Sequence, residues 1–405
     1  MFCLGELLQS IIKILNAYRR IIMNCPNFVR RGLLPAILAS VAMTSMAEAR
    51  QLSYATGYAS GSIGAKAAEV FAKDIEEHSG GDLTAKVYAQ SLLSFSETPP
   101  GIRDGMADSG LVLTPYFPSE FPSTNLATEL TMLIEMTDAP TEKVGLAFAG
   151  AMAEYVFFNC PSCVEEYKQQ NQLFLGGGGT SSYFLICNTP VRTLEEIKGK
   201  RLRIGGAQWA RWANAVGATA VSIPQHETYE ALSQGVVDCS VHSAPELTIV
   251  KLMEVTSDMT PNMPGGVFSG VANNINSDVW KSLTASERRT MLHASAAQAS
   301  ALSWGYAEIA ATNMETAEEK GIKIHKPDAA LVKVTQEFIE QDLEAIAAKY
   351  ADTHGLESPA QLVESFRSLL IKWVDLVKDV DSSEELTQVY WDEVYSKVNV
   401  DSYGR

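Results

Sequence analysis

The sequence predicts an α/β protein assembled from strand-helix-strand units. Residues 193–223 read as helix, strand, helix and strand, and the same alternation appears between residues 52 and 113. Residues 285–320 contain a single glycine and no proline, which favours one long helix. With 405 residues, of which 46% are apolar and 20% charged, the chain is long enough for two globular domains.

The first 49 residues have the features of an export signal. Arg30 and Arg31 form a basic start, residues 33–42 are an apolar run, and residues 47–49 read Ala-Glu-Ala, a small-residue cleavage site. A transmembrane anchor is the alternative, but the run is shorter than the ~20 apolar residues that span a bilayer. We therefore expect cleavage after about Ala49 and a periplasmic protein.

The remaining chain is strongly acidic. Residues 1–49 hold five basic and two acidic residues, so 27 basic and 46 acidic residues remain, a formal net charge of −19. Such a chain repels phosphate backbones, which argues against nucleic acid as a partner. Any anionic ligand must be held by local groups against this field.

The first part of the expected mature chain alternates strands and helices. The expected elements are strands at 52–56, 82–87 and 109–113 and helices at 65–78 and 100–105. The proline-rich segment 115–122 is interpreted as a packed surface turn.

Four cysteines follow the leader: Cys160, Cys163, Cys187 and Cys239. In an oxidising compartment, Cys160 and Cys163 are most simply a local disulfide. A redox-active pair at a helix start is the sharper alternative. Cys187 and Cys239 are either buried thiols or a second bridge. No metal is expected, because the histidines do not cluster with the cysteines in the sequence.

Residues 171–175 read as a strand that runs into four glycines, Gly176 to Gly179. The run lacks the GxxxxGK[ST] pattern of a phosphate-binding loop. A hinge, or a loop that lets a ligand approach the backbone, is the expectation. A further strand is expected at 183–187.

The stretch 193–224 contains the clearest candidate for a ligand-binding motif. Thr193 and Glu196 have the spacing of a capping box, and residues 200–204 alternate polar and apolar as a strand. Gly205 and Gly206 then form a turn into the helix 207–216, and a strand at 218–223 ends at Pro224.

Arg203 stands at the carboxyl end of the expected strand. It offers a planar fork of donors, and the next helix offers free backbone N–H groups, so both features favour a carboxylate. Small ligands in open α/β sheets bind beyond the carboxyl ends of the strands. The alternative is an arginine in a salt bridge at a sheet edge.

Residues 285–320 predict a helix that begins with the capping-box pair Thr284 and Glu287. Two consecutive helices with a break near Gly305 are the alternative. The acidic tail from 328 to 398 is expected to be helical and to brace the second lobe of the chain.

Four ordered blocks in the central stretch carry a family resemblance: L-x-x-[IL]-K-G-x-x-[LI]-R, V-G-A-x-x-V-x-x-P, E-x-Y-x-A-L-x-x-G-V-x-D and K-L-x-E-V. In this order they resemble the solute-binding subunit of TRAP transporters. The matching residues are Leu194, Ile197, Lys198, Gly199, Leu202 and Arg203; Val216 to Ala218, Val221 and Pro224; Glu227, Tyr229, Ala231, Leu232, Gly235, Val236 and Asp238; and Lys251, Leu252, Glu254 and Val255.

The resemblance implies a two-lobed periplasmic binding protein with a ligand cleft between the lobes and a long helix crossing both. The implied division is 1–49 as signal peptide and upstream segment, 50–180 and 269–308 as lobe I, and 181–268 and 309–405 as lobe II with the C-terminal helices.

The resemblance also implies site residues. Arg203 occupies the place of the arginine that pairs with the ligand carboxylate, with Gly205 and Gly206 beside it. His242 stands where the family has asparagine, and Gln225 or His226 corresponds to a frequent aromatic position. Trp209 either closes over the ligand or belongs to the core.

Three further positions follow from the resemblance. Tyr183 lies near the position of a second arginine that some relatives carry. Ligand loops are implied at 57–62 and 90–94.

The implied function is a periplasmic receptor that binds a small organic anion and delivers it to the small and large TRAP membrane subunits. The anion is expected to be a carboxylate such as a dicarboxylate, a hydroxy acid or a keto acid. No cofactor and no catalysis are expected, and the sequence contains neither G-x-S-x-G nor H-E-x-x-H. The alternative is an exported thiol-disulfide oxidoreductase that uses Cys160 and Cys163.

Overall fold

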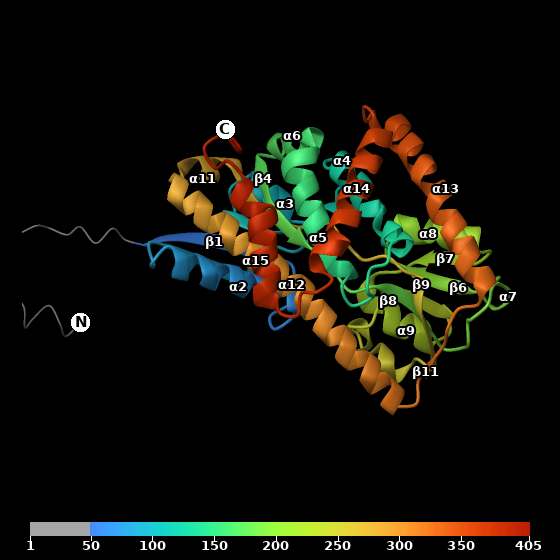
Figure 1. Cartoon of the computed structure of the whole chain (residues 1–405). Coiled ribbons are helices and arrows are strands. Elements are labelled where there is room, and N and C mark those ends of the chain that lie inside the picture. The colour runs from blue at the N-terminus through green and yellow to red at the C-terminus, as the bar shows by residue number, and fades with distance from the viewer. Residues whose placement is uncertain (1–48) are drawn as a thin grey trace, which may run out of the picture. The chain divides into compact units, whose positions relative to one another are not determined.

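The computed structural model describes residues 49–405, and the expected signal segment lies outside these residues. The described chain contains two sheets (Figure 1). The first has five strands in the order β2-β1-β3-β10-β4, and the second has six in the order β11-β9-β5-β8-β6-β7. Helices pack around both sheets, as an α/β protein requires.

The first sheet is built from the beginning of the chain and two later strands. Its strands are β1 (Arg50–Thr56), β2 (Leu83–Ala89), β3 (Ser109–Leu113), β4 (Gln172–Gly178) and β10 (Val271–Asn276). Strand β1 runs parallel to β2 and β3, which confirms the predicted strand-helix-strand units, and β10 is antiparallel to β3 and β4. The helices of this part are α2 (Ile63–His78), α3 (Thr98–Arg103), α4 (Pro122–Glu129), α5 (Val144–Glu154), α6 (Pro161–Gln169) and α11 (Ser277–Ser282).

The second sheet is built mainly from the central stretch. Its strands are β5 (Tyr183–Cys187), β6 (Arg201–Ile204), β7 (Thr219–Ser222), β8 (Cys239–Ser243), β9 (Asp258–Pro264) and β11 (Lys323–Ile324). The accompanying helices are α7 (Leu194–Ile197), α8 (Ala207–Ala215), α9 (Thr228–Ser233) and α10 (Glu246–Ile249). Strand β6 is parallel to β7 and β8, so the predicted unit from 193 to 224 is confirmed.

The long helix α12 (Ala285–Glu319) is continuous over 35 residues, and the alternative of a break near Gly305 is wrong. Thr284 and Glu287 form both hydrogen bonds of the predicted capping box. Near its middle, a Cβ added at Gly305 would lie 3.2 Å from Ile63 of α2. Near its end, Asn313 donates to the Ala244 carbonyl at 2.9 Å, just after β8. The helix therefore contacts elements of both sheets.

The tail forms three helices, α13 (Ala329–His354), α14 (Pro359–Val377) and α15 (Ser383–Glu393). Helix α13 joins the second sheet's helix α8 through two hydrogen bonds from Arg211 to Asp342, at 2.7 and 2.8 Å. Helices α14 and α15 instead pack against α5 and α12. The expectation that the whole tail braces the second lobe is therefore wrong, because only its first helix does so.

Three of the four consecutive glycines belong to strand β4 and not to a hinge loop. Gly176, Gly177 and Gly178 pair with β10 in the first sheet. A Cβ added at Gly178 would lie 2.5 Å from the side chain of Leu302 in α12. The glycines thus allow the long helix to pack directly on the strand.

Two linkers, residues 179–182 and 265–270, connect the two sheets. The linkers lie side by side. The Thr180 amide donates to the Phe268 carbonyl at 3.1 Å, and the Phe268 amide donates to Thr180 Oγ1 at 2.9 Å. The predicted lobe boundaries at 180/181 and 268/269 fall in these linkers, and the exact boundaries stay a prediction.

Two disulfides are present, Cys160 to Cys163 and Cys187 to Cys239. The second, which the sequence left open, joins directly opposed residues of β5 and β8.

Within residues 49–405, no helix combines the length and apolarity needed to cross a membrane.

Candidate ligand-binding site

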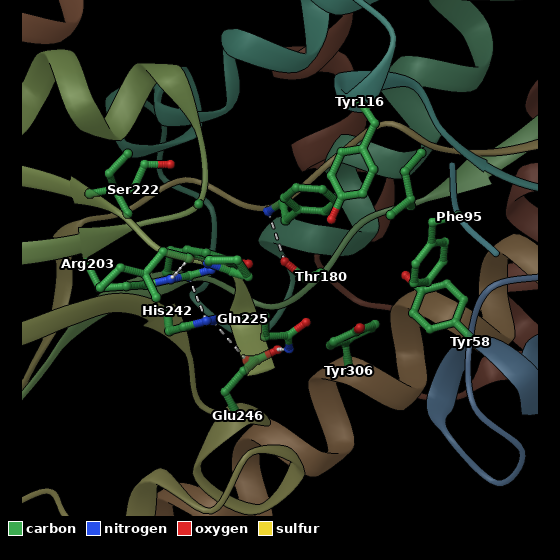
Figure 2. A pocket seen from close by; sticks show the side chains of 17 residues that line it. Tyr58, Phe95, Tyr116, Thr180, Arg203, Ser222, Gln225, His242, Glu246 and Tyr306 are labelled. Atoms are coloured by element: carbon green, nitrogen blue, oxygen red, sulfur yellow. Dashed lines mark hydrogen bonds and ion pairs between the residues drawn. The ribbon is translucent and has the colours of Figure 1, made fainter. Parts of the chain in front are cut away.

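A cavity of about 340 Å³ lies where the two sheets and their linkers meet (Figure 2). Arg203 and His242 come from the second sheet, and Tyr58 follows the first strand of the first sheet. Thr180 comes from a linker, and Tyr306 comes from α12. Each part of the fold therefore contributes to the wall of this cavity.

Arg203 is only 4% exposed, although it lies at the end of β6. Its Nε donates to the carbonyl of Ile223 at 2.9 Å, and Nη1 lies 2.7 Å from Nε2 of His242. These two contacts fix the plane of the guanidinium. Among the described residues, no protein acceptor occupies Nη2, so part of the donor fork remains available on the cavity wall.

His242 is a neutral acceptor in this arrangement. A guanidinium has only donors, so Nε2 of His242 accepts and its proton resides on Nδ1. Burial, and then the charge of Arg203, holds the pKa of His242 well below its usual range. Its Nδ1 lies 3.7 Å from Glu246 Oε2 and has no hydrogen-bond partner among the described residues.

Glu246 begins helix α10 and is 3% exposed. Ser243 Oγ donates to one carboxyl oxygen at 2.6 Å, and Gln225 Nε2 donates to the other at 3.2 Å. Burial raises the pKa of Glu246 to about 7, against the lowering effects of Ser243 and Arg203. The cavity therefore combines one permanent positive charge with one carboxyl group that ionises near neutral pH.

Aromatic side chains form the wall opposite Arg203 (Figure 2). Tyr58 and Phe95 contact edge to face, with ring centroids 4.9 Å apart, and Phe95 and Tyr116 are 6.5 Å apart. Tyr183, Phe268 and Tyr306 also line the cavity. A flat apolar group can contact several rings here.

Most of the predicted site residues lie together. The cavity is lined by Tyr183, Arg203, Gly205, Gln225 and His242. For these five, ligand contact remains a proposal.

Trp209 is a core residue, which is one of the two alternatives that the sequence left open. Its indole is fully buried and stacks on Tyr183, with centroids 4.2 Å apart and an angle of 3°. Its Nε1 donates to the Gly265 carbonyl at 3.0 Å. Trp209 therefore supports a cavity residue from behind.

Gly206 also lies outside this cavity. It precedes α8 and lines a smaller neighbouring cavity.

Gly205 has a specific role in positioning the guanidinium. A Cβ added there would lie 3.2 Å from Nη1 and 3.4 Å from Nη2 of Arg203. Such contacts are tight, so a larger residue would press on the charged group. The glycine keeps this side of Arg203 clear.

Several lining residues were missed by sequence reasoning. Tyr58 falls in the expected ligand loop at 57–62, whereas the expected loop at 90–94 contributes no lining residue and its neighbour Phe95 does. Tyr116 comes from the segment interpreted as a surface turn. Glu246 and Tyr306 carry no sequence signal, because only the fold brings them to the site.

The buried Cys160–Cys163 bridge disfavours the oxidoreductase alternative. Cys160 is 1% exposed and Cys163 is fully buried. Thiol exchange needs a sulfur that a partner can reach. The structure gives neither cysteine that access.

Curated relatives match parts of the chain. A solute-binding protein of Albidiferax ferrireducens is 23% identical over 202 residues, which cover 49% of this chain and 55% of that protein. The uncharacterized protein YiiZ of Salmonella typhimurium is 27% identical over 174 residues, which cover 36% of this chain and 53% of that protein. The chain thus spans about half the length of the curated relatives it matches.

Solved structures match over a larger share. A TRAP periplasmic solute-binding protein from Desulfovibrio salexigens is similar, with a TM-score of 0.68 and 24% identity over 80% of this chain and 97% of that one. A TRAP periplasmic solute-binding protein from Bordetella bronchiseptica, solved with (R)- and (S)-mandelate, is also similar. The TM-score is 0.63 and the sequence identity 22%, and the match covers 80% of this chain and 99% of that one. At these identities the likeness shows the two-lobed fold.

The family model described as bacterial extracellular solute-binding protein, family 7, matches residues 54–350. This range contains both sheets except for the first four residues of β1. It also includes all the residues that line the cavity. The chain belongs to this family, the solute-binding proteins of TRAP transporters.

Proposed function

We propose that this protein binds a small monocarboxylate with a flat apolar body and delivers it to TRAP membrane subunits. The observation that carries the proposal is the buried, partly unpaired guanidinium of Arg203, which lies opposite an aromatic wall. The carboxylate would pair with Arg203, and the apolar body would lie among the rings of Tyr58, Phe95 and Tyr116.

The charges that line the cavity support a single carboxylate. Arg203 is the only lysine or arginine among the described lining residues, and His242 is neutral. A second carboxylate would find no cation and would lie in a cavity that also contains Glu246. The wider expectation of dicarboxylates, hydroxy acids and keto acids is thus narrowed to acids with one negative charge.

The aromatic wall supports the apolar body. Stacked or edge-to-face aromatic contacts contribute about 0.5–1.5 kcal/mol beyond the burial of area. Aromatic acids occur among the ligands of structures with this fold: one contains mandelate and another meta-hydroxyphenylacetate, while others contain pyroglutamate or glucuronate.

Capture requires no covalent chemistry. The ligand would draw the two sheets together, because its carboxylate pairs with the second sheet and its body contacts residues of the first. The linkers at 179–182 and 265–270 would absorb this motion, and the closed form would dock on the membrane subunits. Export by a cleaved signal at residues 1–49 would place the receptor in the periplasm.

A ligand panel tests the proposal. Residues 50–405 are titrated with mandelate, hydroxyphenylacetate, benzoate, succinate and glucuronate while the melting temperature is followed. A ligand at 100 times its Kd adds about 2.7 kcal/mol of stability. We expect the aromatic monocarboxylates to give the largest shifts. Stronger binding of succinate or glucuronate would contradict the proposed ligand class.

A further inference from the structure

We propose that Asp74, His78 and His293 form a zinc-binding site that joins helix α2 to helix α12. The three residues lie outside the ligand cavity, so this inference does not rest on the proposed ligand. Asp74 and His78 are one turn apart on α2, and His293 lies on the neighbouring face of α12.

Two imidazole nitrogens converge on one carboxylate oxygen. Nδ1 of His293 lies 2.8 Å from Oδ1 of Asp74, and Nδ1 of His78 lies 3.2 Å from the same oxygen. One donor atom from each residue lies within 4.8 Å of the donor atoms of the other two. In a tetrahedral zinc site with bonds of ~2.0 Å, ligand atoms are about 3.3 Å apart. Zinc would replace the contacts that these nitrogens make in the structure, which for Nδ1 of His78 include the Asp74 carbonyl at 3.1 Å.

The surroundings hold the imidazoles in position. The rings of His78 and His293 are 4.0 Å apart and tilted by 40°, and Trp391 of α15 contacts His293 edge to face at 5.0 Å. A bound cation would use both rings and the carboxylate together, and the acidic chain attracts it.

The donor set favours zinc over the hard cations. Two imidazole nitrogens and one carboxylate oxygen, with a fourth position left to water, are a common zinc arrangement. Calcium and magnesium prefer shells of oxygen ligands that these three residues do not supply. His78 is 47% exposed at its side chain, which leaves a route of entry from solvent.

Calorimetric titration with zinc chloride tests the site. The protein of residues 50–405, freed of any affinity tag and dialysed against EDTA, is expected to bind about one zinc ion per chain. His78→Ala and Asp74→Asn should each weaken binding by at least about tenfold, as loss of a metal ligand requires. The exposed position of His78 keeps its variant folded even if His293→Ala proves unstable.

Two controls separate this site from others. His226→Ala removes an exposed histidine on the second sheet's side and should leave zinc binding unchanged. Arg203→Ala should also leave it unchanged, whereas it affects the ligand cavity. Cobalt(II) should give the visible absorption of a tetrahedral ion in the parent protein and lose it in His78→Ala. Zinc binding that survives both His78→Ala and Asp74→Asn would overturn the proposal.

Discussion

Nη1 of Arg203 donates a hydrogen bond of 2.7 Å to Nε2 of His242, and this contact keeps the imidazole neutral. The imidazole must be neutral to accept it, so the positive charge stays on one side chain. The Ile223 carbonyl holds the same guanidinium from another direction at 2.9 Å. A carboxylate therefore meets a donor group that is already oriented, which reduces the ordering cost of binding.

Replacing Arg203 should remove most of the affinity for the acid. Hydrogen bonds to charged groups contribute about 1.5–3 kcal/mol each, so Arg203→Ala should weaken binding by about 100-fold or more. Arg201→Ala is the matched control, because Arg201 lies on the same strand, is exposed, and pairs with Asp238 at 2.9 Å. Calorimetry should show near-normal Kd for the control. Equal losses in both variants would contradict a specific role for Arg203.

A methyl group at position 205 should weaken binding without unfolding the protein. Gly205→Ala would place Cβ 3.2 Å from Nη1 of Arg203, so the guanidinium must shift by a few tenths of an ångström. We expect a loss of affinity of about tenfold, since misplaced hydrogen bonds weaken steeply with geometry. The melting temperature without ligand should change little. A variant with unchanged Kd would show that the guanidinium position is not critical.

Much of the fold could be predicted because its signals are local. Capping residues, glycine stops and alternating polarity lie within a few residues of each other, and β3 and β5 have the predicted bounds. The hinge expected at the glycine run is absent for a tertiary reason: these glycines form a strand of the described chain, and Gly178 lies against Leu302, more than a hundred residues away. No local pattern distinguishes a glycine that makes room for a helix from one that bends a hinge.

The site could be predicted only in part for the same reason. Arg203 has a local signal, since it ends a strand just before a glycine turn. Most of the aromatic wall has none: Tyr58 falls in an expected ligand loop, but Tyr116 and Tyr306 come from distant segments. Trp209 illustrates the converse: it lies close to Arg203 in the sequence, yet its side chain packs behind Tyr183.

Affinity for the acid should fall as the pH rises through about 7. Burial raises the pKa of Glu246 to about 7, so this carboxyl is largely neutral below that pH and ionised above it. The ligand anion prefers the neutral form, because an ionised Glu246 adds a like charge to the same cavity. Linkage limits the increase in Kd to tenfold per pH unit.

The variant Glu246→Gln removes this titration. Its Kd should stay nearly constant between pH 6 and pH 8.5, and calorimetry of the parent protein near pH 7.5 should show proton uptake on binding. The pKa of His242 lies well below its usual range, so His242 contributes no competing change in this window. A parent protein whose Kd is flat with pH would contradict the assigned role of Glu246.

Two aromatic substitutions should separate affinity from stability. Tyr116 lines the cavity and is 59% exposed, so Tyr116→Ala should weaken binding of an aromatic acid by about 1 kcal/mol and leave unfolding nearly unchanged. Trp209→Phe should instead lower the free energy of unfolding and leave the affinity for the acid nearly unchanged. It loses the hydrogen bond to Gly265 and leaves space in the core, at a cost of about 1–3 kcal/mol. The measurements are calorimetry with mandelate and urea unfolding.

The two disulfides should differ in their contribution to stability. Cys187 and Cys239 are 52 residues apart, whereas Cys160 and Cys163 are 3 apart. The chain-entropy relation gives about 4 kcal/mol for a loop of ~50 residues and about 2 kcal/mol for a loop of ~4. Paired alanine variants avoid burying hydroxyl groups, so urea unfolding should show the larger loss for Cys187→Ala with Cys239→Ala. Neither pair lines the ligand cavity, so the Kd of the acid should hardly change in either. A larger loss for the Cys160 and Cys163 pair would mean that packing around α6 outweighs loop closure.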